Sequence, residues 1–565
     1  MSKNIVIIGG SAAGPKAAAR ARRLDQKAII TLIQKEEHLS MASCGYPYYI
    51  GGTFDARSAL LSTLDGALRD PDYFINVKNI NAIINTEATV INKENRTVSY
   101  KNLITNETGS INYDELIIAT GATPKKPPID GLDLEGVTHL HSMADTDYLR
   151  KLCERMMVEK AVVIGGGLIG MEVCEALIES EVEEVTIVEF LPQILPFLDW
   201  DLAKLVENHC VTKAVKIITS RSASRFIGNN GELTGIELDD GTIIDCELAV
   251  VAVGVQPNIK LAETAGLEIG KFGGIKVNQY MQTSDEHIYA VGDCIETKSV
   301  ITGQQVLAPM GDLANLEGRV AGENAILGNK KTFPGVLQTG ICKIFEYTAG
   351  STGLSETTAK KLGFDCISSV TSGADKPHFM SAARLISRIT ADRKTGRILG
   401  FQCVGMGDVS RQLATAAMAL AGQLTIDTAA NLDLPYAPPF SPAIDHFIAA
   451  THVLQNKMNG LLTGISAIEV KKKIDSDETP FLLDVRENGE YNQNHIGIGE
   501  TTIPIGELKK RLNELPEDKD KEIICFCHFS LRGYEASLTI RNNGWKNVNV
   551  MEGGISAWPY AMKKQ

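Results

Sequence analysis

The sequence lacks the features that mark disulfide-rich, membrane-spanning and secreted proteins. Its 565 residues include only 11 cysteines and no CxxC pair, which argues against a disulfide scaffold, a zinc site and a thioredoxin-like dithiol. No apolar run approaches the roughly 20 residues needed to cross a bilayer, and the N-terminus shows no signal-peptide pattern. We therefore expect a cytoplasmic protein with no membrane partner and no bound metal.

Positive charge is also scarce. Lys and Arg number 56 against 69 Asp and Glu, and the formal net charge of −13 argues against a nucleic-acid partner. The 51 glycines, 20 prolines and 44% hydrophobic residues are typical of an α/β protein with many tight turns. At about 150 residues per domain the length predicts three or four folded units. Most cysteines should then be buried, and the question is which of them react.

Residues 3–37 follow the order strand, glycine-rich turn, helix, strand. The turn matches the dinucleotide pattern GxGxxG at Gly9 and Gly14, with Ser11 in the middle position. The second strand ends at Gln34, an uncharged side chain that can still hydrogen-bond a ribose. The pattern favours a dinucleotide site, and a purely structural tight turn is the alternative.

A second unit of the same kind occupies residues 160–190. Gly165, Gly167 and Gly170 match all three glycine positions, and Glu189 closes the second strand about twenty residues later. A carboxylate there can accept both ribose hydroxyls and repels a 2′-phosphate, so the sequence favours NADH over NADPH. The alternative for Glu189 is a solvated side chain at a strand end.

Three further segments follow a recognisable order. Two are apolar strands that run into turns, at 113–124 and 252–257, and the third is Tyr289–Asp293 (YAVGD). With both glycine turns, residues 1 to about 450 resemble the pyridine nucleotide-disulfide oxidoreductase family. The resemblance implies FAD on the first unit, NADH on the second, Asp293 as a flavin ribityl ligand, and a C-terminal domain that forms a homodimer. The cofactor-binding residues it implies are Gly9, Gly10, Ser11, Ala12, Ala13, Gly14, Gln34, Lys35, Ser43, Ala119, Thr120, Gly121, Gly165, Gly167, Gly170, Glu189, Gly254, Gly292, Asp293 and Ala314.

One cysteine indicates the subfamily. Cys44 lies in SMASCGYPYYIGG, where Tyr49 occupies the position of the second sulfur of a CxxxxC dithiol, so an internal redox disulfide is excluded. The stretch resembles the single-cysteine branch, which includes coenzyme A disulfide reductases, NADH oxidases and peroxidases, and persulfide reductases. In that branch a lone thiolate forms a mixed disulfide, sulfenic acid or persulfide. We expect positive charge or the flavin to stabilise such a thiolate at Cys44.

The resemblance also implies a substrate site, in which coenzyme A is one possible ligand. Arg20 and Arg23 are candidate ligands for its phosphates, although solvated cations near a helix end would explain them equally well. The remaining candidates are Ser40, His378, Tyr436 and Phe440. Coenzyme A disulfide reductases carry partner-subunit tyrosines in YAPPY and in an upstream stretch. Here the sequence reads Tyr436–Phe440 (YAPPF) and Pro377–Met380 (PHFM), which leaves proton delivery to Tyr436 or His378.

The last hundred residues have a character of their own. The series from Phe481 (FLLDVRE) through His495 to Trp558 resembles a rhodanese domain. Its reactive loop would run from Cys527 to Arg532, with C-x4-R spacing, at the start of a helix whose N–H groups would cradle a persulfide anion. Arg532 would add positive charge for an anionic sulfur substrate. The alternative is an inactive rhodanese fold with a spectator thiol.

The predicted fold class is α/β, with two Rossmann-like dinucleotide-binding domains, an α+β dimerisation domain and a C-terminal α/β rhodanese domain. The expected boundaries are 1–150 with 251–330 (FAD), 151–250 (NAD), 331–454 (dimerisation) and 464–565 (rhodanese). The predicted activity is an NADH-driven flavoenzyme that reduces S–S bonds of persulfides, polysulfides or coenzyme A disulfide at Cys44, with Cys527 handling sulfane sulfur. Two rivals are an NADH oxidase or peroxidase that uses a Cys44 sulfenate, and a sulfur carrier that passes a Cys527 persulfide to another protein.

Overall fold

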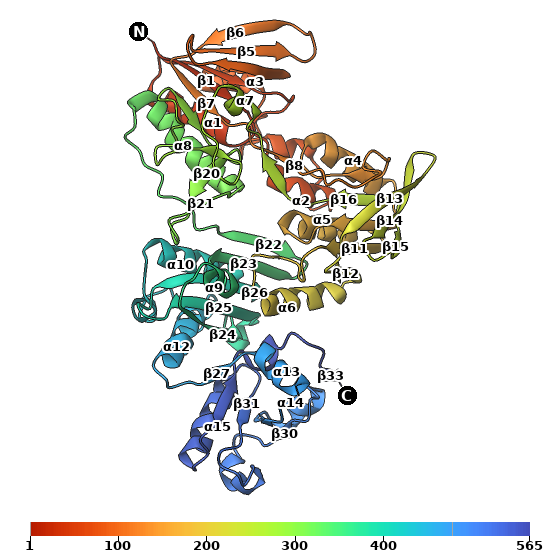
Figure 1. Cartoon of the computed structure of the whole chain (residues 1–565), viewed down its shortest axis with the longest axis vertical. Helices are drawn as coiled ribbons and strands as arrows, with labels where there is room; N and C mark the ends of the chain where they lie inside the picture. Colours follow the sequence, from red (N-terminus) through yellow and green to blue (C-terminus); the bar gives the residue numbers. More distant parts are fainter. Residues whose placement is uncertain (1, 477, 565) are drawn as a thin grey trace. The chain divides into compact units, whose positions relative to one another are not determined.

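The computed structural model describes residues 2–476 and 478–564, and these fall into two compact units (Figure 1). The first unit comprises Met1–Val188 and Arg221–Val336, and the second comprises Glu189–Ser220 and Leu337–Gln565. Within the described ranges, no helix is both long enough and apolar enough to span a bilayer.

The first unit is built on a parallel sheet in the order β19-β7-β1-β2-β3. The central strand β1 has parallel neighbours on both sides, and its residues 5–8 are buried, as expected for a strand covered on both faces. The strands are β1 (Asn4–Ile8), β2 (Ile29–Ile33), β3 (Asn81–Ile83), β7 (Glu115–Ile118) and β19 (Ile288–Ala290).

Two helices beside this sheet pack against each other with their backbones in close contact. They are α1 (Ala13–Leu24) and α8 (Gly311–Leu327). A Cβ on Gly318 would collide with the carbonyl oxygen of Ala13, and a Cβ on Gly322 would collide with that of Ala17. Glycine is therefore required at both positions for the two helix backbones to approach each other.

A second parallel layer in this unit repeats the arrangement. Its strands β9 (Val137–Thr138), β16 (Leu248–Val251), β10 (Lys160–Ile164) and β11 (Glu184–Glu189) lie side by side in that order, and α5 (Leu168–Glu179) follows β10. The two predicted strand-turn-helix-strand units are thus present. The other elements are α2 (Tyr46–Ile50), α3 (Pro71–Lys78), α4 (Met143–Glu154), α7 (Lys260–Thr264), β4 (Thr86–Asn92), β5 (Thr97–Asn102), β6 (Thr108–Asn112), β8 (Ala122–Pro124), β13 (Ala223–Asn229), β14 (Glu232–Leu238), β15 (Ile243–Asp245), β17 (Val255–Pro257), β18 (Ile275–Lys276), β20 (Ile295–Lys298) and β21 (Gln305–Val306).

The second unit begins with an antiparallel sheet in the order β22-β23-β26-β25-β24. Helix α10 (Val409–Ala421) packs on β23 and β26, and α12 (His446–Met458) packs on β24 and β25. The strands are β22 (Gly340–Ile344), β23 (Tyr347–Gly353), β24 (Cys366–Ala374), β25 (Arg384–Asp392) and β26 (Ile398–Gly405). The unit also contains α6 (Trp200–Val211), β12 (Val215–Thr219), α9 (Glu356–Lys361) and α11 (Ile426–Ala429).

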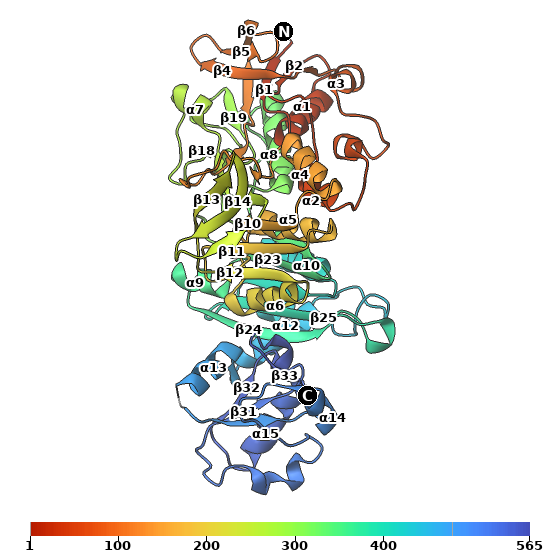
Figure 2. The same ribbon diagram turned by 90° about the vertical axis from the view of Figure 1, so that its right-hand side faces the viewer.

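The C-terminal part of this unit is a parallel sheet in the order β27-β32-β31-β28-β30. Alternate residues of its central strands enter two different cores, because strand side chains alternate between faces. Cys525 packs with Ala536 of α15 (Leu531–Asn542), whereas Phe526 packs with Val470 of α13 (Ala467–Asp475), so helices cover both faces (Figure 2). The remaining elements are β27 (Gly464–Ile465), β28 (Phe481–Asp484), α14 (Asn488–Gln493), β29 (Asn494–His495), β30 (Thr501–Thr502), β31 (Ile523–Phe526), β32 (Val548–Met551) and β33 (Lys563–Lys564).

The last two of the three pattern glycines in the second turn, Gly167 and Gly170, provide a test of this packing. A Cβ on Gly170 would collide with the carbonyl oxygen of Gly165, whereas a Cβ on Gly167 meets no described atom within 4 Å. We expect Gly170→Ala to destabilise the chain by about 2 kcal/mol and Gly167→Ala to stay within about 0.5 kcal/mol. Thermal unfolding followed by circular dichroism measures both variants. Equal midpoints for the two would contradict the packing described here.

Candidate functional site

Cys44 lies in a one-turn 3-10 helix, Ser43–Gly45, directly before α2. A Cβ built on Gly311, the first residue of α8, would be 3.6 Å from the Cys44 Sγ, so the thiol lies beside the start of α8. Cys44 is exposed, whereas the other ten cysteines are buried, and all 11 are free. The expectation that most cysteines are buried is therefore met, and Cys44 is the accessible thiol.

Negative charge surrounds this thiol. Partial burial raises the pKa of Cys44, and the carboxylates of Glu172, Asp293 and Asp312 raise it further. The charged side chains that act on the Cys44 pKa are therefore carboxylates and not cations, and stabilisation of the thiolate by the flavin, the other expectation, stays a prediction. Glu172, on α5, itself has its pKa raised to about 7 by burial, and Tyr48 donates a hydrogen bond to it. The protein thus holds Cys44 toward its neutral thiol form.

Three predicted cofactor residues from distant parts of the sequence meet next to this point. A Cβ on Gly292, which has a φ of +79°, would be 3.4 Å from the Cβ of Ala13 and 3.6 Å from that of Ala314. Asp293 follows directly, and burial raises its pKa. The N–H of Gly292 donates a 2.8 Å hydrogen bond to Glu317, a carboxyl group whose pKa burial raises to about 8. The starts of α1 and α8 therefore frame the Gly292–Asp293 turn.

The first turns of α1 and α5 are suited to bind an anion. Within the described chain, neither Ala12 nor Gly167, the residues that precede these helices, caps its helix with a side-chain hydrogen bond. Free N–H groups and the helix dipole at such ends favour a phosphate group. Gly121 and Gly254 have left-handed φ angles of +65° and +94°, and the structure leaves open space around their Cα atoms. These residues fit a dinucleotide bound at each turn.

The two predicted ligands at the end of β2 have protein partners. Gln34 is buried, and its Oε1 accepts a 2.8 Å hydrogen bond from the N–H of Gly10 while its Nε2 donates to the carbonyl of His38. Gln34 therefore fixes the shape of the glycine turn, a contribution that the sequence did not reveal. Lys35 forms an exposed 2.9 Å ion pair with Glu87.

The segment that follows β7 and the end of β11 also make hydrogen bonds that fix their positions. Thr120, next to Ala119, donates from its hydroxyl to the carbonyl of Asn258 at 2.7 Å, which ties the two apolar strand ends together. Glu189 ends β11, is buried, and accepts a 2.7 Å hydrogen bond from the N–H of Leu191. This bond orients the carboxylate at the strand end, where the sequence expects a ribose.

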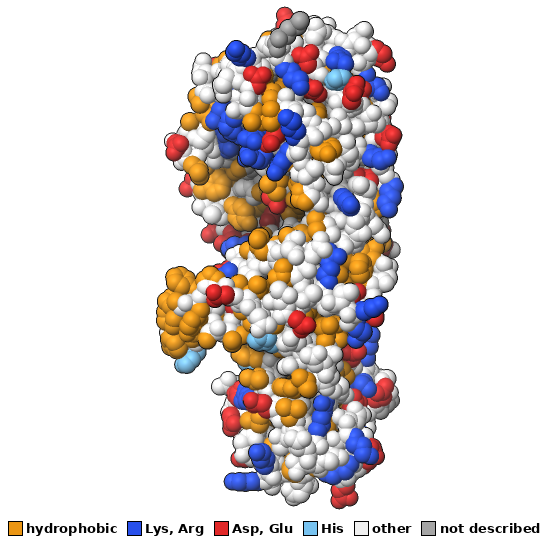
Figure 3. Space-filling model, turned by 90° about the vertical axis from the view of Figure 1, so that its left-hand side faces the viewer, with side chains coloured by type: hydrophobic (Ala, Val, Ile, Leu, Met, Phe, Trp, Pro, Cys, Tyr) orange, Lys and Arg blue, Asp and Glu red, His pale blue; other side chains and the backbone are white. Residues whose placement is uncertain are grey.

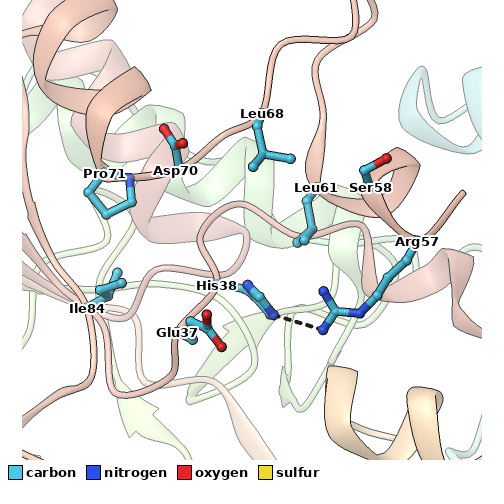
Figure 4. Close-up of a pocket in the computed structure, with 9 residues that line it drawn as sticks. All are labelled: Glu37, His38, Arg57, Ser58, Leu61, Leu68, Asp70, Pro71 and Ile84. Carbon is cyan, nitrogen blue, oxygen red and sulfur yellow. Dashed lines mark hydrogen bonds between the residues drawn. The ribbon is translucent and has the colours of Figure 1, made fainter. Parts of the chain in front are cut away.

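A pocket of about 450 Å³ opens just beyond β2 (Figure 4). His38 and Arg57 point toward each other across it at 3.0 Å, and Arg57 also binds Asp147 with hydrogen bonds of 2.9 and 3.0 Å. The rest of its lining is Glu37, Ser58, Leu61, Leu68, Asp70, Pro71 and Ile84. Sequence analysis missed this pocket, because its lining comes from four separate segments and follows no motif.

The predicted phosphate ligands on α1 differ in their surroundings. Arg20 forms hydrogen bonds of 2.5 and 3.1 Å with Glu323 on α8, so its charge is already matched. Arg23 is exposed at the end of the helix. Ser40 accepts a 3.4 Å hydrogen bond from Arg69, a cation that the sequence did not single out. Of these groups, Arg23 and Arg69 are better placed than Arg20 to meet an anion.

The predicted substrate residues of the second unit are exposed. His378, in the 3-10 helix His378–Met380, and Tyr436 and Phe440 of a later loop all face solvent in the single chain. Figure 3 shows hydrophobic side chains gathered on a projection of one face of the molecule. Exposed aromatic side chains of this kind are typical of an interaction surface.

Cys527 follows β31 and is 2% exposed. Arg532 donates a hydrogen bond toward the Cys527 sulfur and binds Glu490 through two bonds of 2.7 Å. The predicted loop of cysteine and arginine is thus assembled. The sequence analysis did not predict that Glu490 pairs with Arg532.

Comparisons with known proteins identify the families to which these domains are similar. Residues 3–309 match the family model described as pyridine nucleotide-disulphide oxidoreductase, residues 339–448 its dimerisation domain, and residues 466–560 a rhodanese-like domain. The predicted fold class is therefore confirmed.

Individual relatives are also informative. An NAD(P)H coenzyme A polysulfide/persulfide reductase of Pyrococcus horikoshii is 35% identical over 80% of this chain and 99% of its own length. An NADH oxidase of Methanocaldococcus jannaschii is 33% identical over 77% of this chain and 95% of its own. The solved structure of an NAD-dependent persulfide reductase from A. fulgidus matches with a TM-score of 0.93 and 40% identity over 98% of this chain and 100% of that one.

The acidic setting of Cys44 leads to a prediction. Glu172→Gln removes a negative charge from the surroundings of the thiol and should lower the pKa of Cys44 by about half a unit to one unit. At a pH above about 7, where Glu172 is ionised, iodoacetamide should alkylate the variant faster than the parent. Glu179→Gln, an exposed position on the same helix, is the matched control. Identical pH profiles for parent and Glu172→Gln would refute the electrostatic account.

Proposed function

Because the chain belongs to the pyridine nucleotide-disulphide oxidoreductase family, we propose that it is an NADH-driven flavoenzyme that reduces S–S bonds at Cys44. Its proposed substrates are persulfides, polysulfides and coenzyme A disulfide. The observation that carries the proposal is the lone accessible thiol of Cys44 beside the start of α8, in a chain that also bears a rhodanese cysteine. A second sulfur-handling domain is better explained by sulfane sulfur than by oxygen as the electron acceptor.

FAD, when bound, supplies the relay of two electrons from NADH to sulfur. The residues proposed to hold it are the Gly9–Gly14 turn, the start of α1 and the Gly292–Asp293 turn. The Gly165–Gly170 turn and Glu189 are proposed to hold NADH. The open space at Gly121 and Gly254 and the uncapped helix starts support both assignments.

In the proposed reaction the Cys44 thiolate attacks one sulfur of the substrate and the S–S bond breaks. The displaced thiolate or hydrosulfide takes a proton, and two electrons from NADH then release the sulfur attached to Cys44. For a persulfide the sum is RSSH + NADH + H⁺ giving RSH + H₂S + NAD⁺. We also propose that a second copy of the chain contributes Tyr436 and His378, in a homodimer built through the dimerisation domain.

Other expectations stay proposals. The domain boundaries at 150, 250, 330, 454 and 464, the cytoplasmic location and the use of coenzyme A as a ligand are among them. The oxidase rival has a specific basis in the NADH oxidase relative, and the sulfur-carrier rival rests on Cys527.

Anaerobic NADH consumption separates these functions. With polysulfide or coenzyme A persulfide as acceptor, we expect Cys44→Ser to reduce turnover more than about 100-fold, because the attacking sulfur is lost. Cys153→Ser, a buried thiol outside either motif, is the control and should keep the parent rate. Full activity in Cys44→Ser would overturn the proposal, and turnover only with oxygen or peroxide would favour the oxidase.

Nucleotide preference tests the role of Glu189. The parent should oxidise NADH faster than NADPH, because the buried carboxylate repels a 2′-phosphate. Glu189→Gln should narrow the ratio of kcat/KM for the two nucleotides by about tenfold. A parent that prefers NADPH, or an unchanged ratio in the variant, would contradict the assignment.

A further inference from the structure

The segment around β32 fixes the shape of the loop that holds Cys527. The backbone turns through Ser530, at a φ of +88°, and its hydroxyl donates a 3.2 Å hydrogen bond to the carbonyl of Met551. A Cβ on Gly554 would collide with the carbonyl oxygen of Cys527, so the glycine pair that follows β32 packs directly against the loop. The loop therefore presents a defined shape to a sulfur donor.

Two of the cations near this loop, Arg532 and Arg486, are neutralised by carboxylates, whereas Arg384 is a third cation that acts on His528. Arg532 holds both oxygens of Glu490 at 2.7 Å, and this pairing lowers the pKa of Glu490 to about 2, so the carboxylate is ionised at any ordinary pH. Arg486 is buried and donates to both oxygens of Asp484, at 3.0 Å to Oδ1 and 2.7 Å to Oδ2. Each guanidinium is thus matched by one carboxylate, and the two pairs contribute no net charge to a ligand.

The rim of the loop is apolar. Phe529 and Leu531 are 36% and 66% exposed, and they flank the turn at Ser530. Burial lowers the pKa of His528, the third side chain of this segment, so its imidazole is neutral at pH 7. A donor that approaches Cys527 therefore meets aromatic and aliphatic surface.

These features are matched by one class of donor. A small dianion such as thiosulfate loses its hydration on entering, and Arg532, the arginine that bonds toward the Cys527 sulfur, is already paired with Glu490, so it attracts the dianion less than a free guanidinium would. A persulfide carried on an uncharged organic arm brings one charge, on the sulfur that is transferred, and its arm can pack on Phe529 and Leu531.

We propose that the Cys527 site takes sulfane sulfur from persulfides of organic thiols with an uncharged arm and rejects thiosulfate. Glu490 is the specificity-determining residue, because it neutralises Arg532. This inference rests on the proposed function only in that Cys527 handles sulfane sulfur. In the step, the Cys527 thiolate attacks the terminal sulfur of RSS⁻, the S–S bond breaks, RS⁻ leaves, and Cys527 becomes a persulfide anion.

The test uses the full chain carrying Cys44→Ser, so that reduction by NADH does not contribute. Pantetheine persulfide and thiosulfate are the two donors, and cyanide is the acceptor that removes sulfur from Cys527 as thiocyanate. Subtracting the rate of the same chain with Cys527→Ser removes the direct reaction of donor with cyanide. The readout is the ratio of kcat/KM for thiosulfate to that for pantetheine persulfide.

We expect the parent ratio to be about 0.1 or lower and Glu490→Gln to raise it about tenfold, since the variant leaves the Arg532 charge uncompensated. Glu514→Gln, which breaks an ion pair with Arg511 elsewhere in the domain, is the matched control and should leave the ratio unchanged. If Glu490→Gln fails to fold, Phe529→Ser at the exposed rim should still raise the ratio, by weakening the organic donor. A parent that prefers thiosulfate, that transfers sulfur from neither donor, or whose ratio neither variant changes would overturn this inference. The NADH assay of Cys44 is independent of each outcome.

Discussion

The site at Cys44 depends on the close contact between α1 and α8. Two glycines of α8 lie against carbonyl oxygens of α1, and any side chain there would force the helices apart. Since the helices begin at Ala13 and Gly311, the same contact brings the first glycine turn next to the Gly292–Asp293 turn and brings the start of α8 next to Cys44. A packing constraint between the first turns of α1 and the middle of α8 thus determines the geometry around the Gly292–Asp293 turn and Cys44.

The electrostatics of the two thiols differ for physical reasons. Cys44 is exposed, and three nearby carboxylates raise its pKa, so the residues of this chain disfavour its thiolate form. Cys527 is buried beside cations that carboxylates already neutralise. An exposed thiol in an acidic setting is protected from unwanted oxidation and alkylation, because reactivity follows the thiolate fraction. The buried thiol is protected by limited access instead.

Sequence reasoning was strongest where chemistry depends on local spacing. The two glycine turns, Cys44 and the Cys527–Arg532 loop were each predicted, because the residues involved lie within a few positions of one another. It failed where function depends on a partner distant in sequence. Arg20 meets Glu323 at a separation of 303 residues, and Arg532 meets Glu490 at 42. Glu172 carries no motif that would distinguish it from other helix residues, and its raised pKa arises from tertiary burial.

The net charge illustrates the same limit. A value of −13 correctly argues that cations are scarce, but it does not show which cations are available to a ligand. Arg20, Arg388 and Arg532 are all engaged by carboxylates, and Arg388 is buried between Asp201 and Glu356. A guanidinium that forms two hydrogen bonds with a carboxylate loses most of its attraction for a further anion. The electric field of the neutral pair falls off with distance far more steeply than that of a single charge. Counting arginines therefore overestimates anion binding on this chain. Arg23, which is exposed, and Arg69, which bonds the carbonyl of Leu61 and the hydroxyl of Ser40 rather than a carboxylate, are better placed than Arg20 to attract a charged substrate.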